Sequence, residues 1–374
     1  MSKKVLGNLF ALGIALLAFA GCGSDAPILI GLTGPFSESR GVSMRQAAEL
    51  AVREVNARGG IAGRPLQLLA VDDSADTDIA ARVARQFYNN QRVVAVVGHL
   101  TSSTTLAAAP VYSDGENPLV QISPSASSPL ISDAGPYTFR ICPSDLLHGT
   151  RLAEWARTQL GADRAAILYQ NDDYGRGIRS TFASIFLDLG GTIVAEDPYI
   201  DDVPSFAPFL ERVRQQGGAD VLFIAGTSQS GERIRATLDS IGWNAQLLGG
   251  DEMVGIEESM NAEGMLISTA YLPDQPGDRN SEFVRSYRSA FSNQLPDHRG
   301  AGAYDIVHLL AQAIEEVGPE RSRIQDYLSR VGRDIVPFEG VTGTISFDLN
   351  GDVESKDVVI GVVTGGRLVT AAGQ

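Results

Sequence analysis

The chain has 374 residues, of which 45 are acidic and 30 are basic, so its formal net charge at pH 7 is −15. A protein surface with this charge repels nucleic acid and anionic membranes, which argues against nucleic acid as a partner. About 350 residues remain after the N-terminal segment described next, and one hydrophobic core usually stops growing below that length. The sequence therefore predicts two domains.

The N-terminal segment is typical of a processing signal. A basic start at residues 3–4 precedes an apolar run over residues 9–19, which is too short to span a bilayer of ~30 Å as a helix. Small residues at 20–21 come directly before Cys22. This pattern resembles the cleavage box of bacterial lipoproteins, where cleavage leaves Cys22 as the lipidated first residue, although Phe19 stands where leucine is usual. The alternative is a plain secretory signal with an incidental cysteine.

Removal of residues 1–21, the predicted lipoprotein signal peptide, takes away two lysines and no acid, which brings the net charge to −17. Only Cys142 then remains besides Cys22, so we expect no disulfide within the body. No further apolar run follows. We therefore expect an extracytoplasmic protein of the cell envelope, in the periplasm or on the outer face of the cytoplasmic membrane. A lipid anchor would attach it, and stable anchoring needs more than one acyl chain.

From Pro27 onwards, short apolar runs alternate with amphipathic stretches, which predicts a parallel sheet covered by helices. The first unit has predicted strands over residues 28–32, 66–71, 93–97 and 119–122, and predicted helices over residues 47–55, 78–90 and 104–113. The second unit has predicted strands over residues 164–169, 192–195, 221–225, 246–248 and 265–268, and predicted helices over residues 178–189, 206–216 and 232–241. Two such units predict two lobes of related architecture.

The C-terminal third begins with helices and ends with strands. Its predicted helices cover residues 281–293, 302–317 and 321–331, and its predicted strands cover residues 341–347 and 358–363. Between these strands, the turn sequence Asn350-Gly351-Asp352 is typical of a hairpin. No low-complexity linker interrupts the body, so we expect the lobes to be joined by short crossings that act as a hinge.

Motifs of the common enzymes are missing from the sequence. Residues 226–230 read G-T-S-Q-S and lack the closing glycine of a nucleophile elbow. No phosphate-binding loop or dinucleotide fingerprint is present, and the four histidines are widely scattered. Residues 348–352 begin like a calcium loop, but Val353 and Val359 stand where glycine and glutamate are needed. We expect no enzymatic activity, no cofactor and no metal site.

Glycine, serine and aspartate gather where the predicted strands of the first unit end, at residues 31–35, 72–73, 98–103 and 122–127. Ligands of open parallel sheets bind outside the carboxyl ends of the strands. Hydroxyl groups and the free N–H groups of helix N-termini suit a small carboxylate. These segments therefore predict a site for a small ligand that carries a carboxylate.

Six segments, in this order, resemble the branched-chain amino-acid receptors of ABC transporters, which are type I periplasmic-type binding proteins. They are T-G-P at 33–35, V-N-A-R-G-G-I-A-G-R-P-L at 55–66, V-G-H-L-T-S-S at 97–103, I-S-P-S-A-S-S-P at 122–129, D-D-Y-G-R-G at 172–177 and A-E-G-M at 262–265. Their order and spacing extend over nearly the whole mature chain, which makes the resemblance specific although each segment alone is weak.

The resemblance implies two doubly wound α/β lobes joined by a three-segment hinge. Lobe 1 would hold residues 27–144 and 272–347, and lobe 2 would hold residues 145–271 and 348–370. A monomeric receptor of this kind binds its ligand between the lobes and delivers it to ABC permease subunits driven by ATPases. The expected ligand is a branched-chain or a related polar or acidic amino acid.

The resemblance also implies a set of ligand-binding residues, namely Ser102, Ser125, Ala126, Ser127, Tyr174, Thr227 and Asp251. The Ser102 hydroxyl and the backbone N–H groups around Ser125 and Ser127 would hold the ligand carboxylate. The Ser125 carbonyl, the Ser127 hydroxyl and Asp251 would take the ammonium group, and Tyr174 would press on the ligand from lobe 2. The alternative is that these serines only cap helices and turns.

The chain departs from the family pattern at positions that bear on the ligand. Thr227 stands where many members have an aromatic residue, and Arg40 stands roughly where an aromatic residue is frequent at the rim. Ala75 and Thr101 fall where some members carry a linked cysteine pair. The alternatives are therefore an aromatic or other small carboxylate or amide as ligand, a sensory module of the same fold, and an exported hydrolase.

Overall fold

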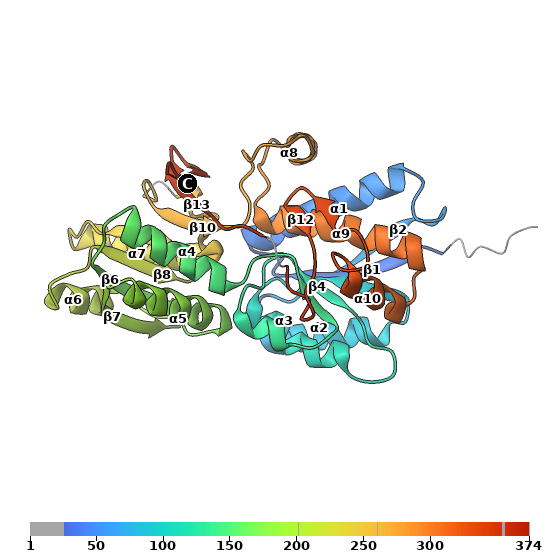
Figure 1. Cartoon of the computed structure of the whole chain (residues 1–374), viewed down its shortest axis with the longest axis horizontal. Helices are drawn as coiled ribbons and strands as arrows, with labels where there is room; N and C mark the ends of the chain where they lie inside the picture. Colours follow the sequence, from blue (N-terminus) through green and yellow to red (C-terminus); the bar gives the residue numbers. More distant parts are fainter. Residues whose placement is uncertain (1–25, 201, 260, 354–355, 374) are drawn as a thin grey trace, which may run out of the picture.

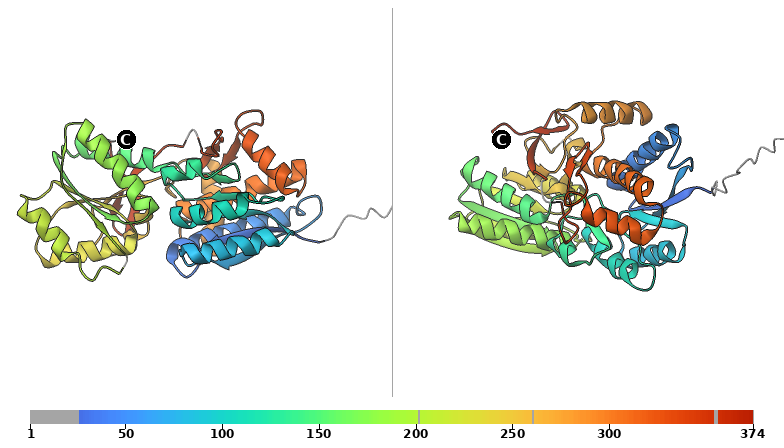
Figure 2. Two further views of the ribbon diagram at one scale, coloured as in Figure 1. Left: turned by 90° about the horizontal axis from the view of Figure 1, so that it is seen from below. Right: turned by 45° about the vertical axis from the view of Figure 1, so that its right-hand side comes forward.

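The computed structural model describes residues 26–200, 202–259, 261–353 and 356–373. The predicted signal peptide and Cys22 lie outside the described residues. The chain forms two α/β lobes, and Figure 1 shows them beside each other along the longest axis of the molecule. In both views of Figure 2, lobe 1 carries the N-terminal (blue) and late (orange) helices, and lobe 2 carries the helices from the middle of the chain (green and yellow). The predicted two-lobed α/β fold is thus confirmed.

Lobe 1 is built on a parallel sheet in the order β2-β1-β3-β4-β5. Its strands are β1 Ile28–Gly34, β2 Leu66–Asp72, β3 Val93–Val97, β4 Gln121–Ser123 and β5 Thr138–Arg140. Its helices are α1 Ser39–Ala57, α2 Thr77–Asn89, α3 Ser102–Ser113, η1 Pro129–Asp133, α8 Asp278–Ala290, α9 His298–Val317 and α10 Arg321–Arg330. A small antiparallel pair, β11 Phe338–Gly340 and β12 Gly343–Ile345, completes it.

Helices cover both faces of this sheet, which explains why its central strand, β3, is apolar throughout. All five residues of β3 are buried. One side of β3 packs into a core with α1, α9 and α10, and the other packs into a core with α2 and α3. A strand buried on both faces reads as a continuous apolar run, as the valine-rich sequence of β3 does.

Lobe 2 is built on a sheet in the order β14-β13-β10-β9-β8-β6-β7. Its strands are β6 Arg164–Gln170, β7 Thr192–Tyr199, β8 Val221–Ala225, β9 Gln246–Gly249, β10 Leu266–Thr269, β13 Val359–Thr364 and β14 Arg367–Thr370. Its helices are α4 Asp145–Thr158, α5 Asp173–Asp188, α6 Ala207–Gln215, α7 Ser228–Ser240, η2 Asp251–Met253 and η3 Ile256–Glu258. Only β13 and β14 run antiparallel to their neighbours within the described part of this sheet.

Along the described residues the chain crosses between the lobes after β5, after β10 and after β12. Arg140, at the end of β5, is 1% exposed and ties the first crossing to the third. Its Nε lies 2.7 Å from Asp352 Oδ1, and its Nη1 donates to the Ser127 carbonyl at 2.9 Å. A buried guanidinium held by a carboxylate and by carbonyl groups fixes the two crossings relative to each other.

The prediction of a hairpin around residues 350–352 is wrong: its turn forms, but the two strands on either side do not pair with each other. The turn itself forms, because the Asp348 N–H donates to the Asp352 carbonyl at 2.9 Å and Phe347 bridges Val353. The flanking strands then separate: β12 pairs with β11 in lobe 1, and β13 pairs with β10 in lobe 2. The turn lies on the third crossing, so each flank finds its hydrogen-bond partners in a different lobe.

Candidate functional site

Lobe 1 contributes buried serines beyond the carboxyl ends of β3 and β4. Ser102 and Ser125 are 2% exposed, and Ser127 is fully buried. The Ser102 hydroxyl accepts the N–H of Ser128 at 3.1 Å, which leaves its own O–H free to donate. The Ser125 hydroxyl lies 3.2 Å from His298 Nε2. Among the described residues the Ser127 hydroxyl has no hydrogen-bond partner.

These serines do not cap the neighbouring helices, although the Ser102 hydroxyl does accept a loop N–H, that of Ser128. Thr101 caps α3 and Ser128 caps η1, each with its side-chain oxygen. The backbone around the serines is partly committed, because the N–H groups of Ser125 and Ala126 both donate to the Ser123 hydroxyl, at 3.3 and 2.9 Å. The donors left for a ligand on this wall are therefore mainly side-chain hydroxyls.

Lobe 2 contributes Asp251, the first residue of η2, which begins after Gly250 at the end of β9. Asp251 is 1% exposed, and neither carboxylate oxygen has a partner at hydrogen-bond geometry among the described residues; the nearby Tyr174 hydroxyl offsets only part of the rise in its pKa. His298 Nε2 lies 3.9 Å from Asp251 Oδ2, too far for a hydrogen bond. Burial, together with the charge of Glu252, raises the pKa of Asp251 to about 7. An unpaired buried carboxylate of this kind is poised to receive a cationic donor.

Tyr174 lies next to this carboxylate. It belongs to the first turn of α5 and is 6% exposed. Its hydroxyl accepts the N–H of Glu252 at 3.4 Å, and a side chain at Gly250 would collide with the same hydroxyl. The Tyr174 ring is therefore fixed against the loop that carries Asp251. Thr227 is placed differently, because its hydroxyl caps α7 by accepting the N–H of Ser230.

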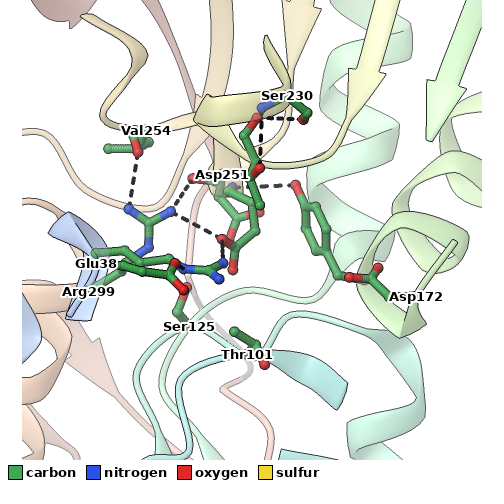
Figure 3. A network of polar contacts seen from close by, with 12 residues as sticks. Glu38, Thr101, Ser125, Asp172, Ser230, Asp251, Val254 and Arg299 are labelled. Carbon is green, nitrogen blue, oxygen red and sulfur yellow. Dashed lines mark hydrogen bonds and ion pairs between the residues drawn. The ribbon is translucent and has the colours of Figure 1, made fainter. Parts of the chain in front are cut away.

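A chain of ion pairs beside Asp251 was not predicted from the sequence. Arg40 Nη1, from α1 of lobe 1, donates to Glu252 Oε2 of lobe 2 at 2.8 Å, and Arg40 Nε donates to Glu38 at 2.7 Å. Arg299 of α9 is 1% exposed and donates to the carbonyls of Asp251 and Val254, both at 3.2 Å. Figure 3 shows Arg299 aimed at the Asp251 loop across the interface of the lobes.

Asp145, the first residue of α4, is the second carboxylate that sequence reasoning missed. It is fully buried, and neither carboxylate oxygen has a partner at hydrogen-bond geometry among the described residues; the nearby Ser127 hydroxyl offsets only part of the rise in its pKa. Burial and the charge of Asp251 raise its pKa well above the usual range. In the sequence Asp145 follows the cap residue Ser144 and looks like an ordinary first-turn acid, so no local signal marked it.

The two lobes are in contact, so the site lies in a closed cleft. Ser103 of α3 donates to Asp173 Oδ2 of α5 at 2.8 Å. Gly177 of α5 lies so close to Pro129 of η1 that a side-chain carbon there would come within 2.9 Å of the proline ring. The site residues are buried because the lobes meet around them.

The described residues contain no group of three or more His, Cys, Asp or Glu side chains that could hold a metal ion. Within the same residues no helix is both long and apolar enough to cross a bilayer.

Comparison with known proteins defines the class of the chain. Residues 26–367 match the family described as periplasmic binding protein. The chain therefore belongs to this family, whose members are non-enzymatic solute-binding proteins, and the expectation of no enzymatic activity is confirmed. Among its solved relatives is an ABC transporter substrate-binding protein from Desulfitobacterium hafniense in complex with leucine. That structure is 32% identical, covers 92% of this chain and 100% of its own, and has a TM-score of 0.79.

Two further relatives support the same family. The branched-chain amino acid transporter substrate-binding protein LivJ from Streptococcus pneumoniae, solved with isoleucine, is 26% identical. It covers 92% of this chain and 100% of its own, with a TM-score of 0.82. The Leu/Ile/Val-binding protein homolog 1 of Brucella abortus is 28% identical over 359 residues, which are 94% of this chain and 93% of the relative. The predicted resemblance to this family is thus confirmed, and the chain is similar over nearly its whole described length to substrate-binding proteins of ABC transporters.

Proposed function

We propose that the chain is the receptor of an ABC uptake transporter for an amino acid that carries a free ammonium group. The single observation that carries this proposal is Asp251, a buried carboxylate without a hydrogen-bond partner among the described residues. It lies near the buried serines, because His298 Nε2 is 3.9 Å from Asp251 and 3.2 Å from the Ser125 hydroxyl. A zwitterion stripped of water needs donors at one end and a charged acceptor at the other. The Ser102 and Ser127 hydroxyls would serve its carboxylate and ammonium ends, and Asp251 would hold the ammonium group.

The surroundings of Arg40 favour an uncharged ligand side chain over an acidic one. Its guanidinium is already paired with Glu38 and Glu252, so it offers little free charge to a ligand carboxylate. The relatives from Desulfitobacterium hafniense and Streptococcus pneumoniae were solved with leucine and isoleucine. Both points support a branched-chain or small polar amino acid as the ligand.

Ligand would stabilise the closed arrangement of the lobes, because its contacts to both lobes exist only there. We place the boundaries at residues 27–144 and 272–347 for lobe 1, and at residues 145–271 and 348–370 for lobe 2. The sheet memberships of β13 and β14 support assigning the C-terminal segment to lobe 2. The closed receptor would act as a monomer and dock on ABC permease subunits.

Cys22 is proposed as the point of lipid attachment, which would hold the receptor at the outer side of a membrane. Cys22→Ala should then move the protein from the membrane fraction to the soluble fraction. Mass spectrometry of the wild-type N-terminus should find Cys22 as the first residue, carrying acyl chains. An unmodified cysteine in a cleaved or intact chain would refute the anchor and leave the receptor function untouched.

A thermal-shift screen tests the ligand class. Ligand at 100 times its Kd stabilises the folded state by about 2.7 kcal/mol, which corresponds to a shift of several degrees. We expect leucine, isoleucine or valine, or a small polar amino acid, to raise the melting temperature, and Asp251→Ala to abolish the shift. A shift given by benzoate and related acids, with none from any amino acid, would contradict the proposal.

A further inference from the structure

We propose that Asp145 and Asp251 together form a two-carboxylate subsite for the cationic group of the ligand, which on binding replaces a proton that the two acids hold. This inference rests on the proposed function, because it assumes a ligand with an ammonium group. It adds Asp145 as a ligand-contacting residue and predicts that binding is linked to proton release.

The two carboxylates converge on the same buried region from different elements. The Asp145 N–H donates to the Ser127 carbonyl at 2.7 Å, which holds the start of α4 against the serine wall. A side-chain carbon on Gly177 would lie 3.1 Å from Asp145 Oδ2, so this carboxylate also lies against α5, the helix that carries Tyr174. Asp251 comes from η2, whose next residue, Glu252, donates its N–H to the Tyr174 hydroxyl at 3.4 Å.

Among the described residues, the arginines nearest the pair are bonded to other carboxylates, so their charges offset only part of the charge of Asp145 and Asp251. The guanidinium groups around the site are each paired with other carboxylates: Arg40 with Glu38 and Glu252 at 2.7 and 2.8 Å, Arg140 with Asp352 at 2.7 Å, and Arg299 with Asp297 at 3.0 Å. Arg299 also lies 3.5 Å from Glu252. Burial opposes the charged form of this third acid, but Arg40 and, to a lesser degree, Arg299 lower its pKa.

The two histidines near the pair are neutral. Burial and the charge of Arg140 lower the pKa of His148 to about 3, and burial and the charge of Arg299 lower the pKa of His298 well below its usual value. His148 bonds the hydroxyl of Ser268 at 3.1 Å. The hydroxyl of Tyr174 stays protonated, because burial and the charge of Asp251 raise its pKa.

Two unpaired carboxylates in one buried region do not both ionise readily, because each charge is desolvated and repels the other. Burial, with this mutual repulsion, raises the pKa of Asp145 well above its usual range, and burial with the charge of Glu252 raises that of Asp251 to about 7. We therefore expect the closed site without ligand to hold a carboxyl proton at neutral pH. When an ammonium group enters, the carboxyl O–H bond breaks, the proton passes to the solvent, and the ammonium group keeps its own protons.

The ligand binds the ionised pair and competes with a proton below pH 7, so affinity should fall as the pH decreases from about 7. Where one proton is released per ligand, the loss is up to tenfold per pH unit. A ligand without a cationic group would bind the protonated pair and would lose affinity as the pH rises.

The experiment is isothermal titration calorimetry of the mature receptor with leucine, or with the amino acid that gives the largest thermal shift, between pH 5.5 and 8.5. Titrations in two buffers of different ionisation enthalpy count the released protons. The variants are Asp145→Asn, Asp251→Asn and a matched control, Asp197→Asn, in which a buried aspartate on the edge strand β7 pairs with Arg212.

We expect the wild type and Asp197→Asn to release up to one proton and to lose affinity three- to tenfold per pH unit below pH 7. Asp145→Asn should bind at least tenfold more weakly and show a flatter pH profile, while its ligand-free melting temperature stays the same or rises because a buried acid is gone. Unchanged affinity and proton release in Asp145→Asn would overturn the inference and leave the proposed function intact.

The inference remains testable even if a variant does not fold, because proton release on ligand binding is measured on the wild type alone. Leucine binding by the wild type that releases no proton at any pH would also overturn the inference. If the wild type binds no amino acid at all, the proposed function itself fails, and that outcome is distinct from both results above.

Discussion

Arg40→Ala should weaken ligand binding by roughly 10- to 100-fold without unfolding the receptor. Arg40 is 16% exposed and its partner Glu252 is 6% exposed, and the two lie in different lobes, so their bond exists only in the closed form. Removing one partner of a buried pair costs roughly 3–5 kcal/mol. Arg299 remains 3.5 Å from Glu252 and retains part of that interaction, which leaves about 1.4–2.8 kcal/mol, or one to two factors of ten in affinity.

Arg45→Ala is the matched control for this prediction. Arg45 lies on the same helix, α1, and its bond to Glu49 joins side chains that are 50% and 40% exposed, so its removal should change affinity by less than about 0.5 kcal/mol. Affinities come from calorimetry, and small-angle scattering with saturating ligand reports closure. Equal affinities for Arg40→Ala and Arg45→Ala would refute the reasoning that the Arg40–Glu252 bond stabilises the closed form.

Two further predictions concern closure and the cost of the buried acid. Gly177→Ala should leave the ligand-free melting temperature unchanged or slightly higher, yet weaken ligand binding. The added carbon would lie 2.9 Å from Pro129 of the opposite lobe and would therefore oppose closure. Equal affinities of Gly177→Ala and the wild type in calorimetry would contradict this. As the pH rises from about 4 to about 7, the free energy of unfolding of the ligand-free wild type should fall relative to that of Asp251→Asn, by up to about 4 kcal/mol. The reason is that Asp251 keeps its proton in the folded state over this pH range, whereas it has lost it in the unfolded state. Urea unfolding at several pH values measures the difference, and parallel curves for the two proteins would exclude it.

The two-lobed fold could be predicted because its signals are local. Alternating apolar runs and amphipathic stretches mark each strand and helix, and strands such as β3 and β8 are buried at every position. Strand ends carry turn and capping residues that point to the cleft, which is why Ser102 and Asp251 could be proposed from the sequence with the help of the family resemblance. The hydropathy pattern does not show which lobe a late strand joins. The two strands predicted to form one hairpin, β12 and β13, pair in different lobes.

The charged part of the site could not be predicted, because its partners are far apart in the sequence. Arg40 and Glu252 are separated by 212 positions, and Arg299 reaches the Asp251 carbonyl over 48 positions. Seen in the sequence, Arg40 is one of many surface-type arginines, and Asp145 is an ordinary first-turn acid of a helix. Only the closed arrangement of the lobes shows that the arginine is paired and the aspartate is not.

The closed form therefore combines opposing electrostatic contributions around one ligand. Pairing of Arg40 with Glu252 favours closure of the empty receptor, whereas the burial of Asp145 and Asp251 without a cationic partner disfavours it. A ligand shifts the equilibrium only by its differential affinity for the closed form. An ammonium group that neutralises the unpaired acids removes the unfavourable contribution and leaves the favourable one in place. Closure then depends on ligand charge as well as on shape, so a neutral analogue of the same size should close the receptor less completely than the amino acid itself.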